Sequence, residues 1–472
     1  MEIITILLAL SLLMFGAYRG HSVIIIAPLC ALLVVALISP AQILPFYSNI
    51  FMVKMVEFVK NYFPVFLLGA IFGKLVEMSG VAESIANTII KLIGAKRTIL
   101  SIVLLCAILT YSGVSLFVVS FAVYPFAKKL FMAADIPKRL IPATITLGAI
   151  SFTMDALPGT PQIQNVIPTA YFNTTLYAAP ILGTLGSIYV LVVGMLFLER
   201  QSKRYRKNGE GYFDSETDEN EIKNGQETNE TSVEESLGRR VSAFIPLVLV
   251  GISNKLFTSY LPKWYPNGFD FAELGLPQFG SIEIQAVLGI WSVILALLLG
   301  IIATVIYNPK IFSQIKTGIN QSIGGSLLAA MNTGSEYGFG GIIAALPGFA
   351  LIQTALGNTF TNPLVNGAVS TNVLAGMTGS ASGGMSIALS AMGDKFITAA
   401  NSAGIPLEVM HRVVSMASGG MDTLPHNGAI ITLLSVTGLT HKQSYKDIFG
   451  ITLLKTSGVV VIIAVYYLTG WV

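Results

Sequence analysis

Two pentads of nearly identical sequence, Met154-Asp-Ala-Leu-Pro158 and Met421-Asp-Thr-Leu-Pro425, decide how the fold of this chain is interpreted. Each pentad lies in an otherwise apolar stretch and follows an Ile-Pro pair, Ile136-Pro137 or Ile405-Pro406, by nearly the same distance. Because a proline inside a helical pattern breaks or kinks the helix, each pentad predicts an interrupted helix. A motif that recurs in the same order in both halves of a chain indicates an internal repeat.

The composition around these pentads is typical of a membrane protein. Of the 472 residues, 53% are hydrophobic and 11% are charged, whereas about a quarter of the residues in an ordinary soluble domain are charged. Disordered and nucleic-acid-binding chains need more polarity or clustered basic charge, so we expect no nucleic-acid partner. We expect an all-α polytopic protein that crosses the lipid bilayer of the cell membrane, inner or plasma, several times.

Apolar runs predict where the chain crosses the bilayer. A spanning helix needs about 20 mostly apolar residues. The first run lacks a basic flank on its amino-terminal side, so it predicts a span and not a cleaved signal peptide. The eight runs that we expect to span the membrane are 2–18, 22–40, 61–79, 178–198, 241–260, 283–307, 340–356 and 449–470.

A polar segment at residues 199–240 divides the chain into two halves, 1–198 and 241–472. The segment carries basic residues at both ends, which predicts a cytoplasmic linker. Within each half, one apolar stretch is interrupted by small and polar residues, and such an interruption at membrane depth predicts a re-entrant helical hairpin. The two hairpins are expected at 98–127 and 367–391.

The pentads follow the hairpins and predict broken helices at 138–172 and 406–435. If the amino terminus lies outside, most basic residues fall inside, the first hairpin opens inward and the second opens outward. We therefore expect two inverted repeats, each with about five transmembrane helices, one re-entrant hairpin and a broken helix after it. Inverted repeats with broken helices are typical of secondary transporters.

The interrupted segments contain the residues that we expect to bind a substrate. Glycine and serine at a hairpin tip expose N–H groups and hydroxyls, and the N-terminus of a half-helix attracts anions without a buried arginine. For a single glycine the alternative is close helix packing through small residues, but for the mirrored pair of tips we favour a binding site. The expected substrate-binding residues are Thr110, Ser112, Gly113, Ser115, Gly159, Thr160, Thr378, Gly379, Ser380, Ser382, Gly383, Gly384, Asn427 and Gly428.

Three ionisable residues at the breaks are candidates for proton coupling: Asp155, Asp422 and His426. Ionisable groups inside membrane spans are costly and usually functional. A buried carboxylate can carry a proton, and an imidazole titrates in the range that a proton symporter needs. The competing interpretation is structural, with each aspartate capping a half-helix and the histidine held by hydrogen bonds. A further acid, Glu336, is interpreted as a marker of the cytoplasmic start of the 340–356 span.

The sequence contains no phosphate-binding loop, zinc-ligand spacing or nucleotide-binding fingerprint. We therefore expect no cofactor and no metal, and transport would have to use an ion gradient. An antiporter of metabolites or ions remains open as an alternative. A membrane-embedded enzyme is less favoured, because it would need a nucleophile–base pair or paired metal ligands, and His426 alone supplies neither.

Two further motifs, Phe72-Gly-Lys-Leu-Val-Glu-Met-Ser-Gly-Val-Ala82 with Ile85-Ala86 after it, and Tyr337-Gly-Phe-Gly-Gly341, are similar to motifs of a known family. They resemble the gluconate permease family, the gluconate:proton symporters of the ion transporter superfamily, and the order of hairpins is similar throughout the chain. The resemblance implies uptake of a gluconate-like sugar acid or other hydroxycarboxylate with protons, sodium being the other possible ion. It also implies a homodimer with a fixed scaffold and a moving transport domain, an elevator-type mechanism.

The chain departs from the family pattern in its first hairpin. Family members carry a Leu-Phe-Phe-Glu-like element where this chain has Leu116-Phe117-Val118-Val119, which lacks the acid. The departure makes a smaller hydroxy acid, such as 3-hydroxybutyrate, or citrate, a candidate substrate beside gluconate.

Overall fold

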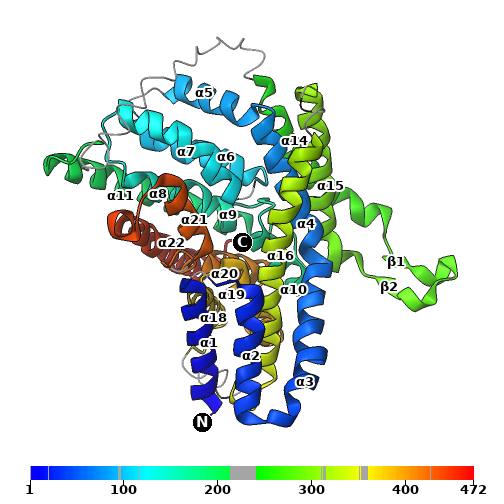
Figure 1. Cartoon of the computed structure of the whole chain (residues 1–472). Helices are drawn as coiled ribbons and strands as arrows, with labels where there is room; N and C mark the ends of the chain where they lie inside the picture. Colours follow the sequence, from blue (N-terminus) through cyan, green and yellow to red (C-terminus); the bar gives the residue numbers. More distant parts are fainter. Residues whose placement is uncertain are drawn as a thin grey trace.

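The fold is a helical one, as predicted. The computed structural model describes residues 2–19, 21–93, 97–114, 116–212, 241–309, 311, 315–349, 351, 360–425 and 427–472. In these ranges the regular structure is helical except for one short antiparallel ribbon, β1 (Phe269–Asp270) with β2 (Ser281–Ile282). This ribbon projects from the body of the molecule (Figure 1).

The first half contains a helix pair, a long helix, a hairpin, an interrupted helix and a long last helix. Its helices are α1 (Glu2–Tyr18), α2 (Val23–Ile38), α3 (Ile43–Phe46), α4 (Met52–Met78), α5 (Val81–Ile93), α6 (Thr98–Tyr111), α7 (Leu116–Ala133), α8 (Leu140–Ala149), α9 (Phe152–Asp155), α10 (Ile163–Phe172) and α11 (Pro180–Lys207). A 3-10 turn (Pro40–Gln42) and a π-helical turn (Tyr47–Phe51) join α2 to α4 through α3.

The second half repeats this order. Its helices are α14 (Ile245–Trp264), α15 (Ile284–Tyr307), α16 (Ile315–Ala345), α18 (Pro363–Thr378), α19 (Ala381–Ser402), α20 (Leu407–Ser418), α21 (Gly428–Thr437) and α22 (His441–Thr469). Two 3-10 turns, Phe271–Leu274 and Pro277–Phe279, lie between β1 and β2. By order along the chain, α4 corresponds to α16, the hairpin α6–α7 to α18–α19, and α11 to α22.

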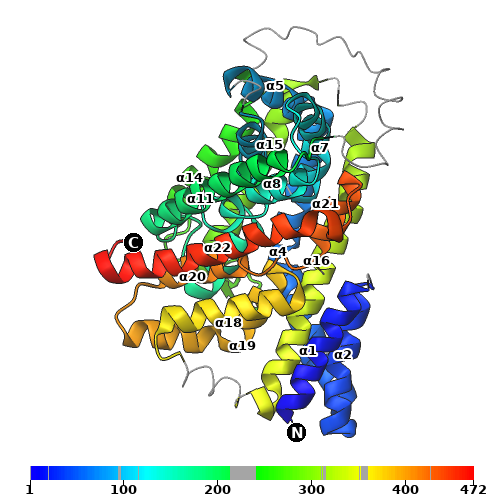
Figure 2. The same ribbon diagram turned by 90° about the vertical axis from the view of Figure 1, so that its left-hand side faces the viewer.

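Two pairs of corresponding helices lie against each other. The long helices α4 and α16 pack side by side, and so do α11 and α22 (Figures 1 and 2). The hairpin α6–α7 lies toward the top of both views, whereas α18–α19 lies toward the bottom. The interrupted helices lie between the two hairpins, so the irregular segments of both halves meet near the centre of the molecule.

Both interrupted helices break beside the pentads. In the first, α8 ends at Ala149, the single turn α9 ends at Asp155, and helix resumes only at Ile163. In the second, α20 ends at Ser418 and helix resumes at Gly428. All ten residues of α8 and ten of the twelve residues of α20 are buried, so the helices that lead into the breaks form the core.

The expected span at 340–356 does not match the structure. The helix there is α16, which begins at Ile315 and ends at Ala345, while residues 350 and 352–356 lie outside the described ranges. Seven glycines and several hydroxyl and amide side chains lower the hydropathy of α16, so the apolar pattern begins too late. Glu336 therefore lies well inside a helix and is only 4% exposed, and its interpretation as an end marker is wrong.

Two other boundaries also differ from expectation. The helix expected at 61–79 begins nine residues earlier, at Met52 in α4. Helix α11 continues to Lys207, so the first residues of the expected linker are helical, while residues 213–240 lie outside the described part of the chain. In both places charged residues extend a helix beyond the apolar run that predicted it.

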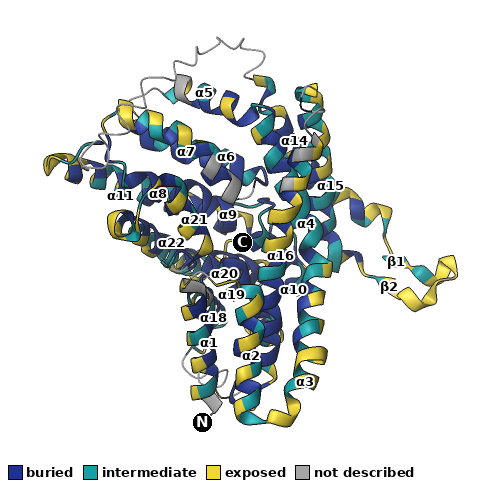
Figure 3. Ribbon diagram, viewed as in Figure 1, coloured by how far each residue is buried: buried dark blue, intermediate teal, exposed yellow. Residues whose placement is uncertain are grey.

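The outer helices present apolar side chains to the surroundings. Exposed leucine, isoleucine and valine recur at helical spacing on α2 and α14 (Figure 3). In water such stripes would be unfavourable, and lipid removes this cost. By length and composition, four helical stretches within the described residues can cross a membrane: Pro40–Met78, Pro180–Lys207, Ile284–Tyr307 and His441–Thr469. These observations identify a membrane protein.

The crossing of α18 and α19 tests this packing. A Cβ atom on Gly384 would overlap the backbone of Ala375, whereas one on Gly324, also helical, would meet nothing within 4 Å. Gly384→Ala should therefore lower the melting temperature in detergent, while Gly324→Ala should leave it unchanged or raise it, because alanine favours a helix over glycine by about 1 kcal/mol. Fluorescence-detected size-exclusion chromatography after heating measures both variants. Equal melting temperatures would contradict the described crossing.

Candidate functional site

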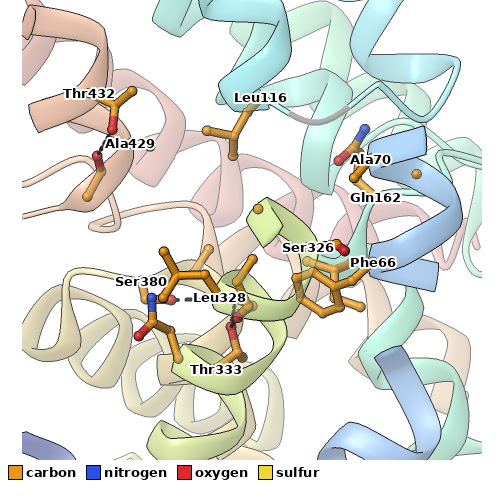
Figure 4. A pocket seen from close by; sticks show the side chains of 18 of the residues that line it. Phe66, Ala70, Leu116, Gln162, Ser326, Leu328, Thr333, Ser380, Ala429 and Thr432 are labelled. Atoms are coloured by element: carbon orange, nitrogen blue, oxygen red, sulfur yellow. Dashed lines mark hydrogen bonds between the residues drawn. The ribbon is translucent and has the colours of Figure 1, made fainter. Parts of the chain in front are cut away.

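A cavity of about 940 Å³ lies where the irregular segments of the two halves meet. One side is formed by α4 and α16, with Phe66 and Ala70 from the former and Ser326 and Thr333 from the latter (Figure 4). The facing side is formed by the tips of both hairpins and by the segments that follow both helix breaks. Sequence positions more than 250 residues apart, such as Gln162 and Thr432, therefore line the same space.

Four helices begin at the wall of this cavity. Residues in the first turns of α7, α10, α19 and α21 line it: Leu116, Ile163, Ala381 and Ala429. The first turn of a helix carries unpaired N–H groups and a partial positive charge. Four such ends that meet at one cavity make it suitable for an anionic group.

Each break is tied to the tip of the hairpin in its own half. Gln162, which precedes α10, donates through Nε2 to the carbonyl oxygens of Thr110 (2.6 Å) and Val114 (3.1 Å). Asn427, which precedes α21, donates through Nδ2 to the carbonyl oxygen of Gly379 (2.7 Å). In each half, therefore, an amide side chain just before the second part of the interrupted helix bonds the break to the hairpin tip.

The sequence-predicted site residues divide into two groups. Seven of them line the cavity: Gly113, Gly379, Ser380, Ser382, Asp422, Asn427 and Gly428. Seven others are packed outside its lining: Thr110, Ser112, Asp155, Gly159, Thr160, Gly383 and Gly384. The side chain of Thr378 and the residues Ser115 and His426 lie outside the described part of the chain.

Hydrogen bonds and backbone conformation account for several small or hydroxylated residues of the first tip and the first break. Ser112 donates to the carbonyl oxygen of Ile108 (2.6 Å), and Thr160 donates to that of Thr153 (2.8 Å). Gly113 and Gly159 have φ angles of +93° and +85°, which an L side chain rarely adopts. These positions therefore have a geometric reason to be small or hydroxylated, whatever the cavity binds.

Asp422 forms a buried ion pair with Lys455 of α22. Lys455 Nζ also donates to the carbonyl oxygen of Ile150, at the end of α8 (3.1 Å). Both charged side chains are less than 5% exposed. Asp155 lies near enough to interact electrostatically with both members of the pair. The cluster therefore brings charged side chains of both breaks close enough to interact.

Neither aspartate caps a half-helix. The residue before α10 is Gln162, which makes no capping bond, and the residue before α21 is Asn427, whose Oδ1 accepts from the N–H groups of Ala429 (2.6 Å) and Ile430 (3.1 Å). Ser380 plays the same part for α19, accepting from the N–H of Gly383 (3.0 Å). The capping interpretation of Asp155 and Asp422 is therefore wrong.

Arg412 of α20 is completely buried and donates hydrogen bonds to the first half of the chain, around the interrupted helix. Its guanidinium donates to the carbonyl oxygens of Ala178 (2.8 Å from Nη2), Leu176 (3.3 Å) and Asp155 (3.0 Å from Nη1), and to Oδ1 of Asn165 (3.0 Å). These carbonyls belong to backbone that has left the helical pattern, and each would be costly to bury unpaired.

His411, next to Arg412, completes this network. Its Nε2 lies 3.1 Å from Oδ1 of Asn165, and its Nδ1 lies 2.6 Å from the hydroxyl of Thr174. Because an amide oxygen can only accept, Nε2 donates to Oδ1 of Asn165, while Nδ1 pairs with the hydroxyl of Thr174. Both nitrogens of the ring are thus hydrogen-bonded in the core.

The sequence interpretation missed Arg412, Lys455 and His411, and misplaced Glu336. One signal was present for Lys455, which is the single charged residue between Phe449 and Val472 in an apolar run. Arg412 carried a similar signal, since it lies in a stretch predicted to be in the membrane. A buried cation in a span implies a partner, but the partner can be identified only in three dimensions.

The Asp422–Lys455 pair provides a test of these contacts. Removal of one partner leaves a buried charge uncompensated, which costs about 3–5 kcal/mol, whereas replacement of both by apolar residues is often nearly neutral. Lys455→Met and Asp422→Leu should each lower the melting temperature more than the double variant does. Lys74→Met, which breaks the partly exposed pair with Glu77, is the control and should change stability by about 1 kcal/mol or less. Additive losses in the double variant would contradict the buried pair.

Comparison with known proteins agrees with this architecture. The GntP family permease profile matches residues 1–441. The chain is 62% identical over 477 residues, and over the full length of both proteins, to a Bacillus subtilis (strain 168) protein named uncharacterized transporter YxjC. Its fold is similar to the crystal structure of the Alcanivorax borkumensis YdaH transporter, with a TM-score of 0.55, 17% identity and coverage of 89% of this chain and 88% of that one. The protein is therefore a transporter and not an enzyme, and it belongs to the GntP family of permeases.

Proposed function

We propose that the protein is a secondary active transporter of the cell membrane that moves a small organic acid anion together with protons. The observation that carries this proposal is the cavity at which four helix N-termini meet. A carboxylate in the cavity would lie at the positive ends of these helices and would accept hydrogen bonds from those first-turn N–H groups that Ser380 and Asn427 do not cap. Sites at the meeting point of broken helices are a recurrent feature of secondary transporters.

Unpaired acceptors in the wall favour a substrate that carries hydroxyl groups. Within the described residues, Oε1 of Gln164 and Oδ1 of Asn332 have no hydrogen-bond partner, and both residues line the cavity. A buried acceptor without a donor is costly, and a substrate hydroxyl would supply that donor. A hydroxycarboxylate, such as a sugar acid or 3-hydroxybutyrate, offers both the anion and the donors.

The contacts also support an elevator-type movement. Each hairpin tip is bonded to its own break, and Arg412 of α20 is bonded to Asp155, to α10 and to the segment that joins α10 to α11, so these segments form one connected body. The cavity lies between this body and the pair α4 and α16. The hairpins approach from opposite ends of the molecule, which is the placement expected of inverted repeats (Figures 1 and 2). A rigid shift of the body past α4 and α16 would expose the cavity to each side in turn, in each subunit of a homodimer.

The charged cluster at the breaks is one candidate for the site of the coupled proton. Asp422 is paired with Lys455, and Asp155 interacts electrostatically with Lys455 and Arg412, so the four groups carry no net charge when both acids are ionised. A proton on either acid would compensate the charge of a bound anion inside the membrane.

A gradient-driven flux measurement tests the function. In proteoliposomes, a one-proton symport of a monovalent anion moves no net charge, so an inward gradient of about one pH unit should drive about tenfold accumulation. Radiolabelled 3-hydroxybutyrate, gluconate and citrate would be compared, and an uncoupler should abolish accumulation. Sodium-driven uptake, or exchange that ignores the proton gradient, would contradict the proposal, and the second result would favour an antiporter.

Gln164 tests the substrate class. Gln164→Leu keeps the side-chain size but removes the unpaired acceptor, so affinity for a hydroxycarboxylate should fall about tenfold, as expected for the loss of one hydrogen bond of about 1.4 kcal/mol. Affinity for the deoxy analogue should not change. Competition against uptake gives both values, and Gln201→Leu, on α11 away from the cavity, is the control. An equal loss for both compounds would argue against a hydroxyl contact at Gln164.

A further inference from the structure

Glu336 has a position that differs from those of the other buried acids. It lies well inside α16, is 4% exposed and lines the cavity. Its Oε2 has no hydrogen-bond partner among the described residues. The carboxyl group rests against Gly383 in the first turn of α19, where a Cβ atom would overlap Oε2, and the hydroxyl of Ser380 lies within reach of it. Glu336 thus touches the tip of the second hairpin from the neighbouring long helix.

The charged groups on the long helices do not neutralise Glu336. On α4, Lys54 is paired with Glu57 (3.0 Å) and Lys74 with Glu77 (2.8 Å). Its chain neighbour Tyr337 is hydrogen-bonded to Tyr171 of α10 and lies beneath the ammonium group of Lys54. In the part of the chain that the structure describes, no lysine, arginine or histidine forms an ion pair with Glu336.

The groups on the other neighbouring elements are also committed or distant. On α19 the charged residues are Asp394 and Lys395, which are exposed and lie near the opposite end of the helix. The segment before α2 contributes His21, at the cavity edge, and helix α2 itself contains no charged residue. Across the cavity, Asp422 is occupied by Lys455. Among the acids of the described residues that line the cavity, Glu336 is therefore the one without a cationic partner.

The chain itself supplies cations at the two breaks. The ammonium group of Lys455 lies between a carboxylate and the carbonyl of Ile150, and the guanidinium of Arg412 pairs with the carbonyl of Asp155 at the first break and with that of Ala178 after α10. Unwound carbonyls and carboxylates are the groups that bind coupling cations in transporters with broken helices. Here both places are already occupied by side chains, so a mobile cation has to bind elsewhere.

We infer that Glu336, and not the charged cluster at the breaks, binds the coupling proton, an inference that rests on the proposed proton symport. The proton binds to Oε2, and the neutral carboxyl group can then donate a hydrogen bond into the cavity. Protonation removes a negative charge beside the anion site, so binding of the proton and binding of the anion favour each other. It also removes the cost of moving an unpaired charge along the interface between α16 and α19.

The test separates this inference from the proposed function. Glu336→Gln mimics the protonated state, so it should retain exchange of radiolabelled 3-hydroxybutyrate across the membrane without a gradient, to within about threefold of wild type. It should lose accumulation driven by an inward proton gradient. Glu336→Asp should restore part of the accumulation. Glu57→Gln, on α4 and outside the cavity lining, is the matched control and should accumulate substrate like wild type.

Proton uptake provides the second measurement. In weakly buffered detergent solution, addition of 3-hydroxybutyrate to wild-type protein should raise the pH, because binding of the anion draws a proton onto Glu336, and the Glu336→Gln variant should show no such change. Gradient-driven accumulation in folded Glu336→Gln, or an unchanged proton uptake, would overturn the inference and leave the symport intact. Failure of wild type itself to respond to a proton gradient would overturn the proposed function instead.

Discussion

Backbone groups released where a helix breaks inside a membrane must find partners within the protein, and the centre of this molecule is arranged to provide them. Arg412 pairs the carbonyl of Asp155 at the first break and carbonyls of the segment that follows α10, while Lys455 pairs the carbonyl at the end of α8 and neutralises Asp422. Amide side chains at Gln162 and Asn427 then tie each break to a hairpin tip. Because these partners come from both halves of the chain, satisfying the breaks also joins the halves.

The same requirement creates the cavity. Helices that begin in the middle of the protein have their N-terminal N–H groups at its centre, and four such ends face one space of about 940 Å³. In the proposed anion site the positive charge comes from backbone, while the buried side-chain cations pair with carbonyl oxygens and with Asp422. A binding site of this kind needs acids only to carry protons, which makes the acid without a cation, Glu336, the informative one.

The sequence allowed the broken helices and hairpin turns to be predicted because glycine, proline and aspartate interrupt apolar runs at those points. The pentads at Met154 and Met421 and the glycines at Gly113 and Gly379 all lie where helices end. The extent of the long helix α16 was not predicted in this way, since its glycines and hydroxyl groups lower hydropathy without breaking the helix. The pairing of Lys455 with Asp422, and of Arg412 with distant carbonyls, could not be predicted, because such contacts depend on how helices pack and not on local pattern.

Gly428 is well placed to test whether the cavity binds the substrate and opens to each side of the membrane in turn. A side chain there would meet nothing within 4 Å, and the residue lines the cavity beside the N-terminus of α21. With Cys30 and Cys106 replaced by alanine, Gly428→Cys would be treated with a membrane-impermeant maleimide in right-side-out and inside-out vesicles. We expect labelling from both sides, slowed in both cases by the transported anion. Labelling from one side only would show that the cavity does not open to both sides, and a rate that the anion does not change would show that the anion does not bind there.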